Sequence, residues 1–282
     1  FDIIHTHSPM FPTLPMVANL QADAPVVGTF HTCTGRDLIY YRIYAKPAQQ
    51  LIDRMAGRIA VSKCCARENN DFFEGHFDVI PNGVDVGWWS KGARRIERFD
   101  DGVTNILFLG RPDRRNGLDS LISAFSGVHA ERPDTRLIIV GDGPLRFHFE
   151  KQVPREMRGA VHFVGSANGE RPDYLATADV FCFLPSIASF GITILEGMSA
   201  GKAIIASDIE AFRDLIADGK SGLLCPPNDE ETLKAAILRL VDDRELRARL
   251  GKAARAGVDR YDWPRVAEEH IEYYRNILHN LA

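Results

Sequence analysis

Short apolar segments alternate with helix-like patterns along the whole chain. The apolar segments are rich in Val, Ile, Leu and Phe, whereas the stretches between them repeat apolar side chains every three to four positions. This alternation is typical of β-α-β units and predicts an α/β protein built on parallel sheets. The predicted strands cover residues 2–5, 25–30, 58–61, 78–80, 104–109, 136–140, 160–164, 179–183, 203–206 and 222–225.

The order of these elements predicts two Rossmann-like, doubly wound domains, of which the first is incomplete. The turn Pro81-Asn82-Gly83 and a charged, aperiodic stretch end the first series, and each strand of the second series is followed by a helix candidate. Because the chain begins without Met inside a predicted strand, we expect a segment to precede it. The predicted divisions are a first domain over residues 1–88 with helices near 12–22, 38–56 and 63–74, a linker over 89–102, a second domain over 103–262 and a terminal amphipathic helix over 263–282.

Composition and charge exclude several classes of protein. The chain has 282 residues, and 34 Lys and Arg against 38 Asp and Glu give a formal net charge of −4, which argues against a nucleic-acid partner or a polybasic membrane surface. No stretch approaches the length of apolar sequence that a membrane-spanning helix needs. The cysteines lack the spacing of a zinc site or a disulfide framework, so we expect buried thiols in a reducing cytoplasm and no metal. They are Cys33, Cys64, Cys65, Cys182 and Cys225.

Polar clusters follow the first two predicted strands, at the sheet edge where doubly wound domains bind ligands. His5 ends the first predicted strand, and we expect His7 in the loop beyond it, where the side chain can face a cleft. His31 and Thr32 follow the second strand. A lone strand-end histidine also serves as a structural hydrogen-bonding group, but two polar clusters on one edge favour a site.

In the second domain, Arg111 comes directly after a predicted strand and a glycine. Guanidinium groups suit a diphosphate, and the alternative is a solvated basic loop that includes Arg115. The later strand before Gly141-Asp142-Gly143 resembles part of a dinucleotide fingerprint, but Arg146 stands where the third glycine belongs. A nicotinamide site is therefore not expected.

The segment after residue 184 is the most informative. A strand ends at Pro185, a loop with Gly191 follows, and a helix is predicted to begin near Ile192. The free backbone N–H groups of a helix start form an anion site. Glu196 could accept hydrogen bonds from a ribose diol, although a glutamate early in a helix also stabilises the helix dipole.

Together these motifs stand in the order found in retaining, nucleotide-sugar-dependent glycosyltransferases of family 4, which have the GT-B fold. The resemblance covers essentially the whole chain and is strongest to the phosphatidylinositol mannosyltransferase branch. The family motifs are Asn82-Gly83-Val84-Asp85, Phe108-Leu109-Gly110-Arg111, Gly141-Asp142-Gly143, Phe163-Val164-Gly165, and Phe190-Gly191 before Glu196-Gly197-Met198. The branch motifs are His5-Thr6-His7, Thr29-Phe30-His31-Thr32, Ala60-Val61-Ser62 and Tyr261-Asp262-Trp263.

The resemblance implies a hexosyltransferase that moves a sugar from a nucleoside-diphosphate sugar to an acceptor hydroxyl. The first domain would hold the acceptor, a glycolipid precursor in this branch, and the second would hold the donor. The terminal helix would cross back to the first domain. No metal or other cofactor is implied, because arginine and helix N-termini stabilise the leaving diphosphate. The expected location is the cytoplasm at the inner face of the membrane, with peripheral association through the preceding segment.

The resemblance also assigns individual roles. Arg111 would bind the diphosphate, Glu196 the ribose hydroxyls, and His7 would support the reacting centre. His31 and Thr32 would lie on the acceptor side. The remaining donor-site positions are Arg115 and Asn116, backbone groups of Ser166 and Ala167 for the base, Ala188 and Phe190, and the backbone N–H groups of Gly191, Ile192 and Thr193 for the phosphate.

Two positions depart from the family pattern. Ala188 stands where the first of two paired glutamates belongs, and Asn116 stands in place of a lysine, whose charge Arg114 or Arg115 could replace. Loss of one directed charge commonly lowers the rate by a factor on the order of 10²–10³. The alternatives are therefore a catalytically weakened or dead nucleotide-sugar-binding protein, or a nucleotide-sugar epimerase of the same fold.

Overall fold

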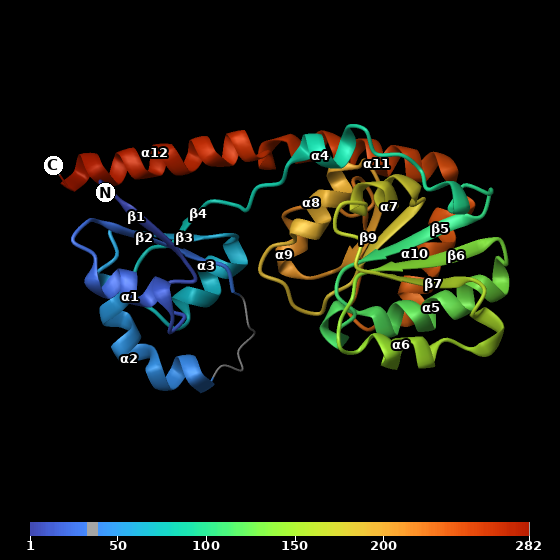
Figure 1. Ribbon diagram of the computed structural model, residues 1–282, viewed down its shortest axis with the longest axis horizontal. Coiled ribbons are helices and arrows are strands. Elements are labelled where there is room, and N and C mark those ends of the chain that lie inside the picture. Colours follow the sequence, from blue (N-terminus) through green and yellow to red (C-terminus); the bar gives the residue numbers. More distant parts are fainter. Residues whose placement is uncertain (33–38, 282) are drawn as a thin grey trace. The chain divides into compact units, whose positions relative to one another are not determined.

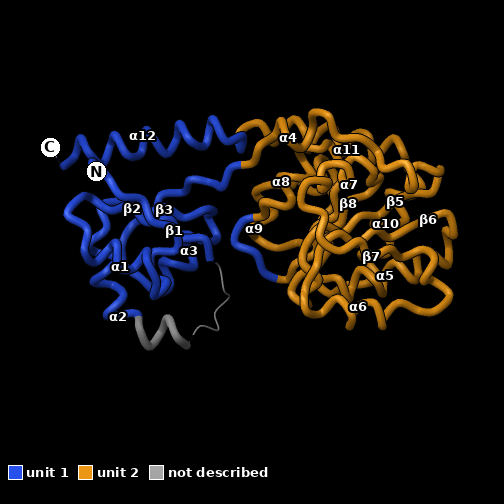
Figure 2. The backbone as a smooth tube through the Cα atoms, viewed as in Figure 1, with its two compact units in different colours: residues 1–83, 187–190, 261–282 blue, residues 84–186, 191–260 orange. Residues whose placement is uncertain are grey.

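The computed structural model describes residues 1–32 and 39–281 and contains two compact units, each built on a parallel sheet (Figure 2). The expected α/β class with two parallel-sheet domains is confirmed. Cys33, the first residue of the helix expected over 38–56 and the last residue of the expected terminal helix lie outside the described residues. Unit 1 comprises Phe1–Gly83, Ile187–Phe190 and Tyr261–Ala282, and unit 2 comprises Val84–Ser186 and Gly191–Arg260.

Unit 1 contains a four-stranded parallel sheet in the order β1-β2-β3-β4 (Figure 1). The last helix of the chain completes its core, because Val266 and Ile277 pack against Val27 and Ile59 of the central strands. The elements are β1 (Ile4–His7), α1 (Leu14–Gln21), β2 (Val26–Phe30), α2 (Ile39–Asp53), β3 (Gly57–Ala60), α3 (Lys63–Asn70), β4 (Asp78–Val79) and α12 (Trp263–Leu281).

The first strand lies two residues later than predicted. Its pairing with β2 runs from Ile4 opposite Val26 to His7 opposite Thr29. The apolar residues before Ile4 have no partner in β2, which begins only at Val26, so hydrophobicity alone misplaced the strand. The expectation that His7 lies in the loop beyond the strand was therefore wrong, since His7 is the last residue of β1.

Unit 2 contains a six-stranded parallel sheet in the order β10-β9-β8-β5-β6-β7. Its strands agree with the predicted ones to within one residue at each end. Its elements are α4 (Val86–Ser90), η1 (Glu97–Phe99), β5 (Thr104–Leu109), η2 (Arg114–Asn116), α5 (Leu118–Glu131), β6 (Thr135–Val140), α6 (Arg146–Gln152), η3 (Arg155–Met157), β7 (Val161–Gly165), α7 (Arg171–Thr177), β8 (Val180–Phe183), α8 (Ile192–Ser199), β9 (Ala203–Ser207), α9 (Glu210–Arg213), β10 (Leu223–Cys225), α10 (Glu230–Asp242) and α11 (Arg244–Val258), and η4 (Asp259–Tyr261) leads back to unit 1.

Helices cover both faces of the unit 2 sheet (Figure 1). On one face, Ile106 and Phe108 of β5 pack in a core cluster with residues of α5, α6 and α10. The alternate residues Leu107 and Leu109 are equally buried on the other face. A sheet that is covered on both sides requires continuous apolar strands, which explains why the sequence pattern located these strands so closely.

The segment expected as a linker over 89–102 contains the end of α4 and η1, and both pack as part of unit 2. Asp85 caps α4 by accepting a hydrogen bond from the Trp88 backbone N–H at 2.8 Å. Trp89 and Phe99 are buried. Burial of these two aromatic side chains anchors the segment to unit 2. The many charged residues around them led to the prediction of a linker.

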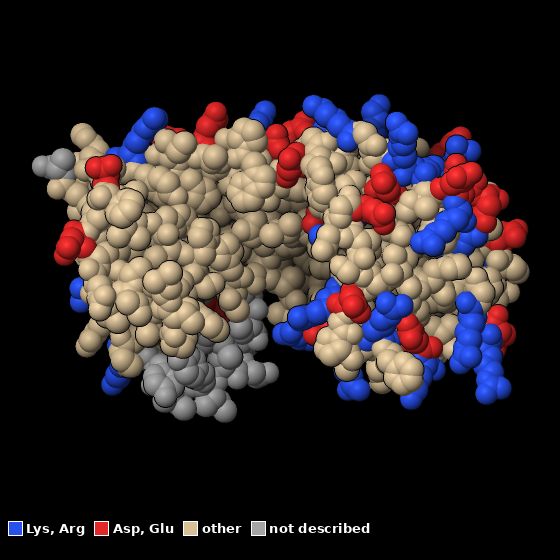
Figure 3. Space-filling model, in the orientation of Figure 1, with Lys and Arg blue, Asp and Glu red and all other residues tan. Residues whose placement is uncertain are grey.

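Charged side chains of both signs are interspersed over unit 2, whereas the face of unit 1 shown in Figure 3 has few of them. This mixed pattern fits the net charge of −4. Among the described residues, no helix is both long enough and apolar enough to cross a bilayer. Cys64, Cys65, Cys182 and Cys225 are buried thiols that form no disulfide within the described part of the chain, as expected for these four.

Candidate functional site

The order of strands in unit 2 reverses between β5 and β8, so their carboxyl ends form the topological switch point of the sheet. Parallel sheets bind ligands in the crevice at such a point. Arg111 follows β5, and Gly191 opens α8 after β8. The two loops are joined directly, because the Ser186 N–H donates to the Arg115 carbonyl oxygen at 3.0 Å. The predicted phosphate-binding positions therefore lie in segments at the same edge of the sheet.

Glycines surround the base of the Arg111 side chain. A Cβ at Gly143 would lie 2.8 Å from Arg111 Cγ, and one at Gly141 would lie 1.9 Å from the Gly110 carbonyl oxygen. Glycine at both positions is thus what lets the chain pass so close to this arginine. The Arg111 side chain is 58% exposed and has one weak ion pair, 3.3 Å from Asp113. Its guanidinium is largely available to a ligand.

Asn116 has a structural role in the same loop. Its Nδ2 donates to the Arg111 carbonyl oxygen at 2.7 Å, which ties the two ends of the loop together. Arg115 is 72% side-chain exposed and lies 3.6 Å from Asp113. The positive charge of this loop is therefore carried by its arginines, and Asn116 holds the backbone that carries them.

Gly191 is the N-cap of α8 and adopts a φ of +134°, a backbone conformation that favours glycine. A Cβ here would lie 2.8 Å from the Phe212 ring. The next residues, Ile192 and Thr193, begin the helix, where backbone N–H groups have no intrahelical acceptor. Ile192 is exposed, so this end of α8 is open to solvent.

Glu196 lies on α8 and is buried. Its Oε2 accepts a hydrogen bond from Arg171 Nη2 at 2.7 Å. Burial raises the pKa of Glu196 to about 7, and the Arg171 charge acts in the opposite direction. Arg171 also lies over the Trp89 ring, 5.3 Å from its centre. Sequence reasoning missed Arg171 and Trp89, and no motif in the chain singles out either residue.

The remaining predicted donor residues fall into two groups. In unit 2, Ser166 is exposed just after β7 and Ala167 is buried beside it. Ala188 and Phe190 belong to unit 1, where the Phe190 ring packs edge-on against Tyr261, with centroids 5.9 Å apart. The roles predicted for these residues stay predictions.

In unit 1, the two histidines of β1 and His31, which follows β2, form one cluster with residues of α12. His5 Nδ1 lies 2.5 Å from the Tyr274 hydroxyl, and His5 Nε2 lies 2.7 Å from Thr29 Oγ1. Both ring nitrogens of His5 are thus engaged. Burial lowers the pKa of His5 to about 4, with further lowering by His7, His270 and His31. His5 is therefore neutral at neutral pH.

His7 and His31 form a hydrogen-bonded pair. His7 Nδ1 lies 2.7 Å from His31 Nε2, and the two rings are stacked with centroids 5.0 Å apart. Partial burial lowers the pKa of both histidines, and each has a second histidine nearby that lowers it further. The structure thus brings His7 and His31 together, while Thr32 is exposed next to them along the chain. Two neutral imidazoles joined in this way can accept and relay a proton.

The histidine cluster opens into a cavity of about 340 Å³ within unit 1. Sequence reasoning missed the residues that α12 contributes, although Trp263, Ala267, His270 and Tyr274 recur at the helical spacing that could have identified one face. The lining residues are His5, His7, Thr29, His31, Val61, Ile80, Pro81, Asn82, Trp263, Ala267, His270, Ile271 and Tyr274. Across the described part of the chain, no group of three or more His, Cys, Asp or Glu side chains is placed to hold a metal ion.

Known protein families match both parts of the chain. Residues 91–257 match the family described as glycosyl transferases group 1, and residues 1–88 match the family described as glycosyltransferase family 4. The phosphatidyl-myo-inositol mannosyltransferase of Mycolicibacterium smegmatis is 35% identical over 98% of this chain and 72% of its own length. The enzyme of the same name from Mycobacterium tuberculosis is 34% identical over 98% of this chain and 74% of its own length.

Solved structures show the same fold at lower sequence identity. Sucrose-phosphate synthase from Thermosynechococcus elongatus has a TM-score of 0.81 and 22% identity, and the match covers 99% of this chain and 74% of that protein. HepE of Anabaena in complex with UDP-glucose has a TM-score of 0.82 and 20% identity, over 98% of this chain and 79% of that protein. The expected GT-B fold is therefore confirmed.

Proposed function

This chain belongs to the group 1 glycosyl transferases, and on that premise we propose that it transfers a hexose from a nucleoside-diphosphate sugar to an acceptor hydroxyl with retention at the anomeric carbon. HepE of Anabaena, which shares the fold, is seen with UDP-glucose, and this supports a nucleotide-sugar donor. The single observation that carries the proposal is the exposed guanidinium of Arg111, set among glycines at the switch point of unit 2.

The proposed chemistry depends on stabilising a leaving diphosphate. Arg111 can bind it through two parallel N–H groups, and the start of α8 at Gly191, Ile192 and Thr193 adds backbone N–H groups and the positive end of the helix dipole. Both are fixed before the sugar–oxygen bond breaks, so they stabilise developing charge without reorganisation. Because these groups supply the positive potential, we propose a reaction that needs no metal or other cofactor.

We propose that the acceptor binds in the unit 1 cavity, with His31 and Thr32 beside it and His7 supporting the reacting centre. The lowered pKa of His7 and His31 leaves their rings neutral at neutral pH, so the pair can accept a hydrogen bond from an attacking hydroxyl. The acceptor would be a glycolipid precursor at the inner face of the membrane, because relatives at 34–35% identity are named phosphatidyl-myo-inositol mannosyltransferases.

A weakened or non-enzymatic nucleotide-sugar-binding protein is the second candidate, and Ala188 favours it. The alanine has no carboxylate to contact the donor sugar, and Asn116 adds no charge to the phosphate loop. Within residues 1–32 and 39–281, no structural feature favours the nucleotide-sugar epimerase over the transferase to which the family assignment points.

The donor site is tested by thermal unfolding with UDP or GDP in the presence of a chelator. We expect either nucleotide to raise the unfolding midpoint, and Arg111→Ala to abolish the rise because it removes the main phosphate contact. Arg155→Ala, an exposed arginine on η3, is the matched control and should behave like the unchanged protein. Absence of a shift with both nucleotides, or an undiminished shift in Arg111→Ala, would disprove the donor-site assignment.

Turnover distinguishes the two candidates. In the transferase, Ala188→Glu should raise the rate with the preferred sugar donor by a factor on the order of 10²–10³. A protein that binds nucleotide but shows no transfer before or after this change, across a panel of donors, would support the non-enzymatic candidate.

A further inference from the structure

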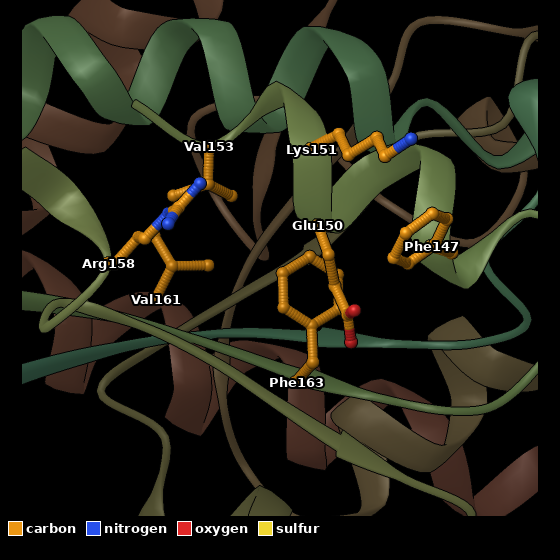
Figure 4. Close-up of a pocket in the computed structure, with 7 residues that line it drawn as sticks. All are labelled: Phe147, Glu150, Lys151, Val153, Arg158, Val161 and Phe163. Atoms are coloured by element: carbon orange, nitrogen blue, oxygen red, sulfur yellow. The ribbon is translucent and has the colours of Figure 1, made fainter. Parts of the chain in front are cut away.

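Unit 2 contains a second cavity, of about 320 Å³, that the proposed transfer reaction does not use. It lies between α6 and the edge strand β7, and we call it the α6–β7 cavity (Figure 4). Its size is at the lower end of the range for small-molecule sites, roughly 300–1,000 Å³. The lining residues are Phe147, Glu150, Lys151, Val153, Arg158, Val161 and Phe163.

Most of the wall is apolar. The Phe163 ring lies near the middle of the cavity, and Val153 and Val161 are buried at one end (Figure 4). Phe147 is 66% exposed at the other end, which is a large aromatic surface for a side chain on a folded domain. Flat aromatic surfaces of this kind favour a ligand with a ring of its own, through stacked or edge-on contacts.

The cavity also has a cation without a partner. The guanidinium of Arg158 lies beside Val153 and Val161, and it has no hydrogen bond or ion pair with any of the described residues (Figure 4). Lys151 lies at the other end, 4.4 Å from the centre of the Phe147 ring, and likewise has no carboxylate partner in the described part of the chain. An anion in the cavity would therefore meet positive charge that no protein carboxylate neutralises.

Glu150 does not cancel this potential, because its carboxylate is already paired. Arg146 Nε donates to Glu150 Oε1 at 2.8 Å, and Arg146 Nη2 donates to the Phe163 carbonyl oxygen at 3.2 Å. Arg146 thus fixes α6 against β7 and leaves the charges of Lys151 and Arg158 in excess. The cavity combines an aromatic floor with one guanidinium at its end.

We propose that the α6–β7 cavity binds a small aromatic carboxylate. The carboxylate pairs with the Arg158 guanidinium, whose planar fork matches a carboxylate in two parallel hydrogen bonds. The ring rests on Phe163 between Val161 and Phe147, and Lys151 adds positive charge at the far end.

This site is separate from the proposed donor site on the same unit. Arg158 and Val161 lie at the amino end of β7, whereas Arg111 and Gly191 follow the carboxyl ends of β5 and β8. Phe147, near the start of α6, lies toward the carboxyl edge of the sheet, but the carboxylate-binding end of the α6–β7 cavity, at Arg158 and Val161, lies at the amino edge. Loss of donor binding at Arg111 should therefore leave the carboxylate-binding end intact. Failure of one proposal can therefore be told from failure of the other.

Calorimetric titration of the whole chain with 2-naphthoate tests the inference, with 2-naphthamide as the uncharged ligand of the same shape. We expect saturable binding of the acid and binding about tenfold weaker for the amide, since the amide forfeits the charge-assisted pair. Arg158→Gln should weaken binding of the acid about tenfold and leave the amide unchanged. Arg155→Gln, an exposed arginine of η3 outside the cavity, and Arg111→Ala should bind as the unchanged protein does.

Phe147→Ala tests the aromatic contact with the ligand, which does not depend on charge. Its side chain is largely exposed, so the fold should tolerate the change, and binding of both acid and amide should weaken together. The proposal is overturned if the acid does not saturate in the millimolar range, if acid and amide bind equally, or if Arg158→Gln binds the acid as tightly as Arg155→Gln does.

Discussion

At the residue scale, the neutral histidines of unit 1 couple folding to pH. The folded pKa of His5 is about 4, below the ordinary value of 6.5 for an unfolded chain, because burial disfavours the charged ring. The unfolded state therefore binds more protons between these values. The contribution of His5 to stability is present above pH 6.5 and is lost as the pH falls through the folded pKa.

Proton NMR can measure this titration directly. We expect the ring resonance of His5, identified by its absence in His5→Gln, to titrate with a midpoint near 4. The free energy of unfolding of His5→Gln should fall less steeply than that of the unchanged protein as the pH is lowered from 6.5. A midpoint at the ordinary value of 6.5 would contradict the burial and hydrogen bonding described for His5.

Glu196 makes the stability change with pH in the opposite direction to His5. Burial raises its pKa from 4.5 to about 7, so the folded state holds the extra proton, and the associated stability is present below pH 4.5 and lost as the pH rises through 7. Glu196→Gln cannot ionise. Relative to the unchanged protein, its free energy of unfolding should therefore increase between these pH values by an amount on the order of 3 kcal/mol.

Urea unfolding at the two ends of this pH range checks the Glu196 prediction. The pKa of about 7 already includes the opposing effect of the Arg171 charge, and the packing lost on substitution contributes a nearly constant amount, so only the change with pH is diagnostic. A difference between Glu196→Gln and the unchanged protein that is the same at both pH values would contradict the prediction.

At the element scale, the sequence predicted strand limits best where both faces of the strand are buried. β5 is apolar at alternate positions on both faces, so its predicted and observed limits coincide at residues 104–109. β1 was misplaced because its limits depend on where β2 begins, which hydrophobicity does not record. α4 was missed because it has five residues and is held by the Asp85 cap and buried Trp89.

The same contrast holds for the candidate sites. Arg111 and Gly191 lie in the segments that follow β5 and β8, so the rule for parallel sheets was enough to place them at one edge. Tyr274 meets His5 from a position 269 residues away, and Arg171 meets Glu196 across 25 residues. Contacts of this kind depend on how elements pack, and no local pattern in one sequence encodes them.

Gly191 offers a test of how α8 begins. An alanine there would take a φ of +134° and place its Cβ 2.8 Å from the Phe212 ring, so Gly191→Ala should lower the free energy of unfolding by about 1–3 kcal/mol. It should also weaken nucleotide binding, because the first N–H groups of α8 would shift. Chemical denaturation measures the first effect, and nucleotide titration measures the second.

Gly159→Ala is the matched control, since a Cβ at Gly159 meets no atom within 4 Å. Its stability should stay within about 0.5 kcal/mol of the unchanged protein. Equal stability of the two alanine variants would show that the cap of α8 accommodates a side chain, contrary to the geometry of Gly191.

At the scale of the whole molecule, each unit has its own sheet and its own core cluster. Calorimetry should therefore resolve two unfolding transitions instead of one. UDP or GDP should raise only the transition of unit 2, by a free energy of about 2.7 kcal/mol at a hundredfold excess over the dissociation constant. A single transition that moves as a whole with nucleotide would contradict independent unfolding.

The division of unit 1 along the chain has a consequence for biosynthesis. Its sheet is encoded by the first 83 residues, but Val266 and Ile277, which complete its core, lie in the final segment Tyr261–Ala282. A ribosome synthesises the chain from the N-terminus toward the C-terminus. The apolar face of the nascent unit 1 sheet therefore stays uncovered while unit 2 is translated and folds. The sheet of unit 1 is thus synthesised before unit 2, whereas its core is completed after unit 2, and termination of translation before residue 261 would leave unit 2 folded and the core of unit 1 incomplete.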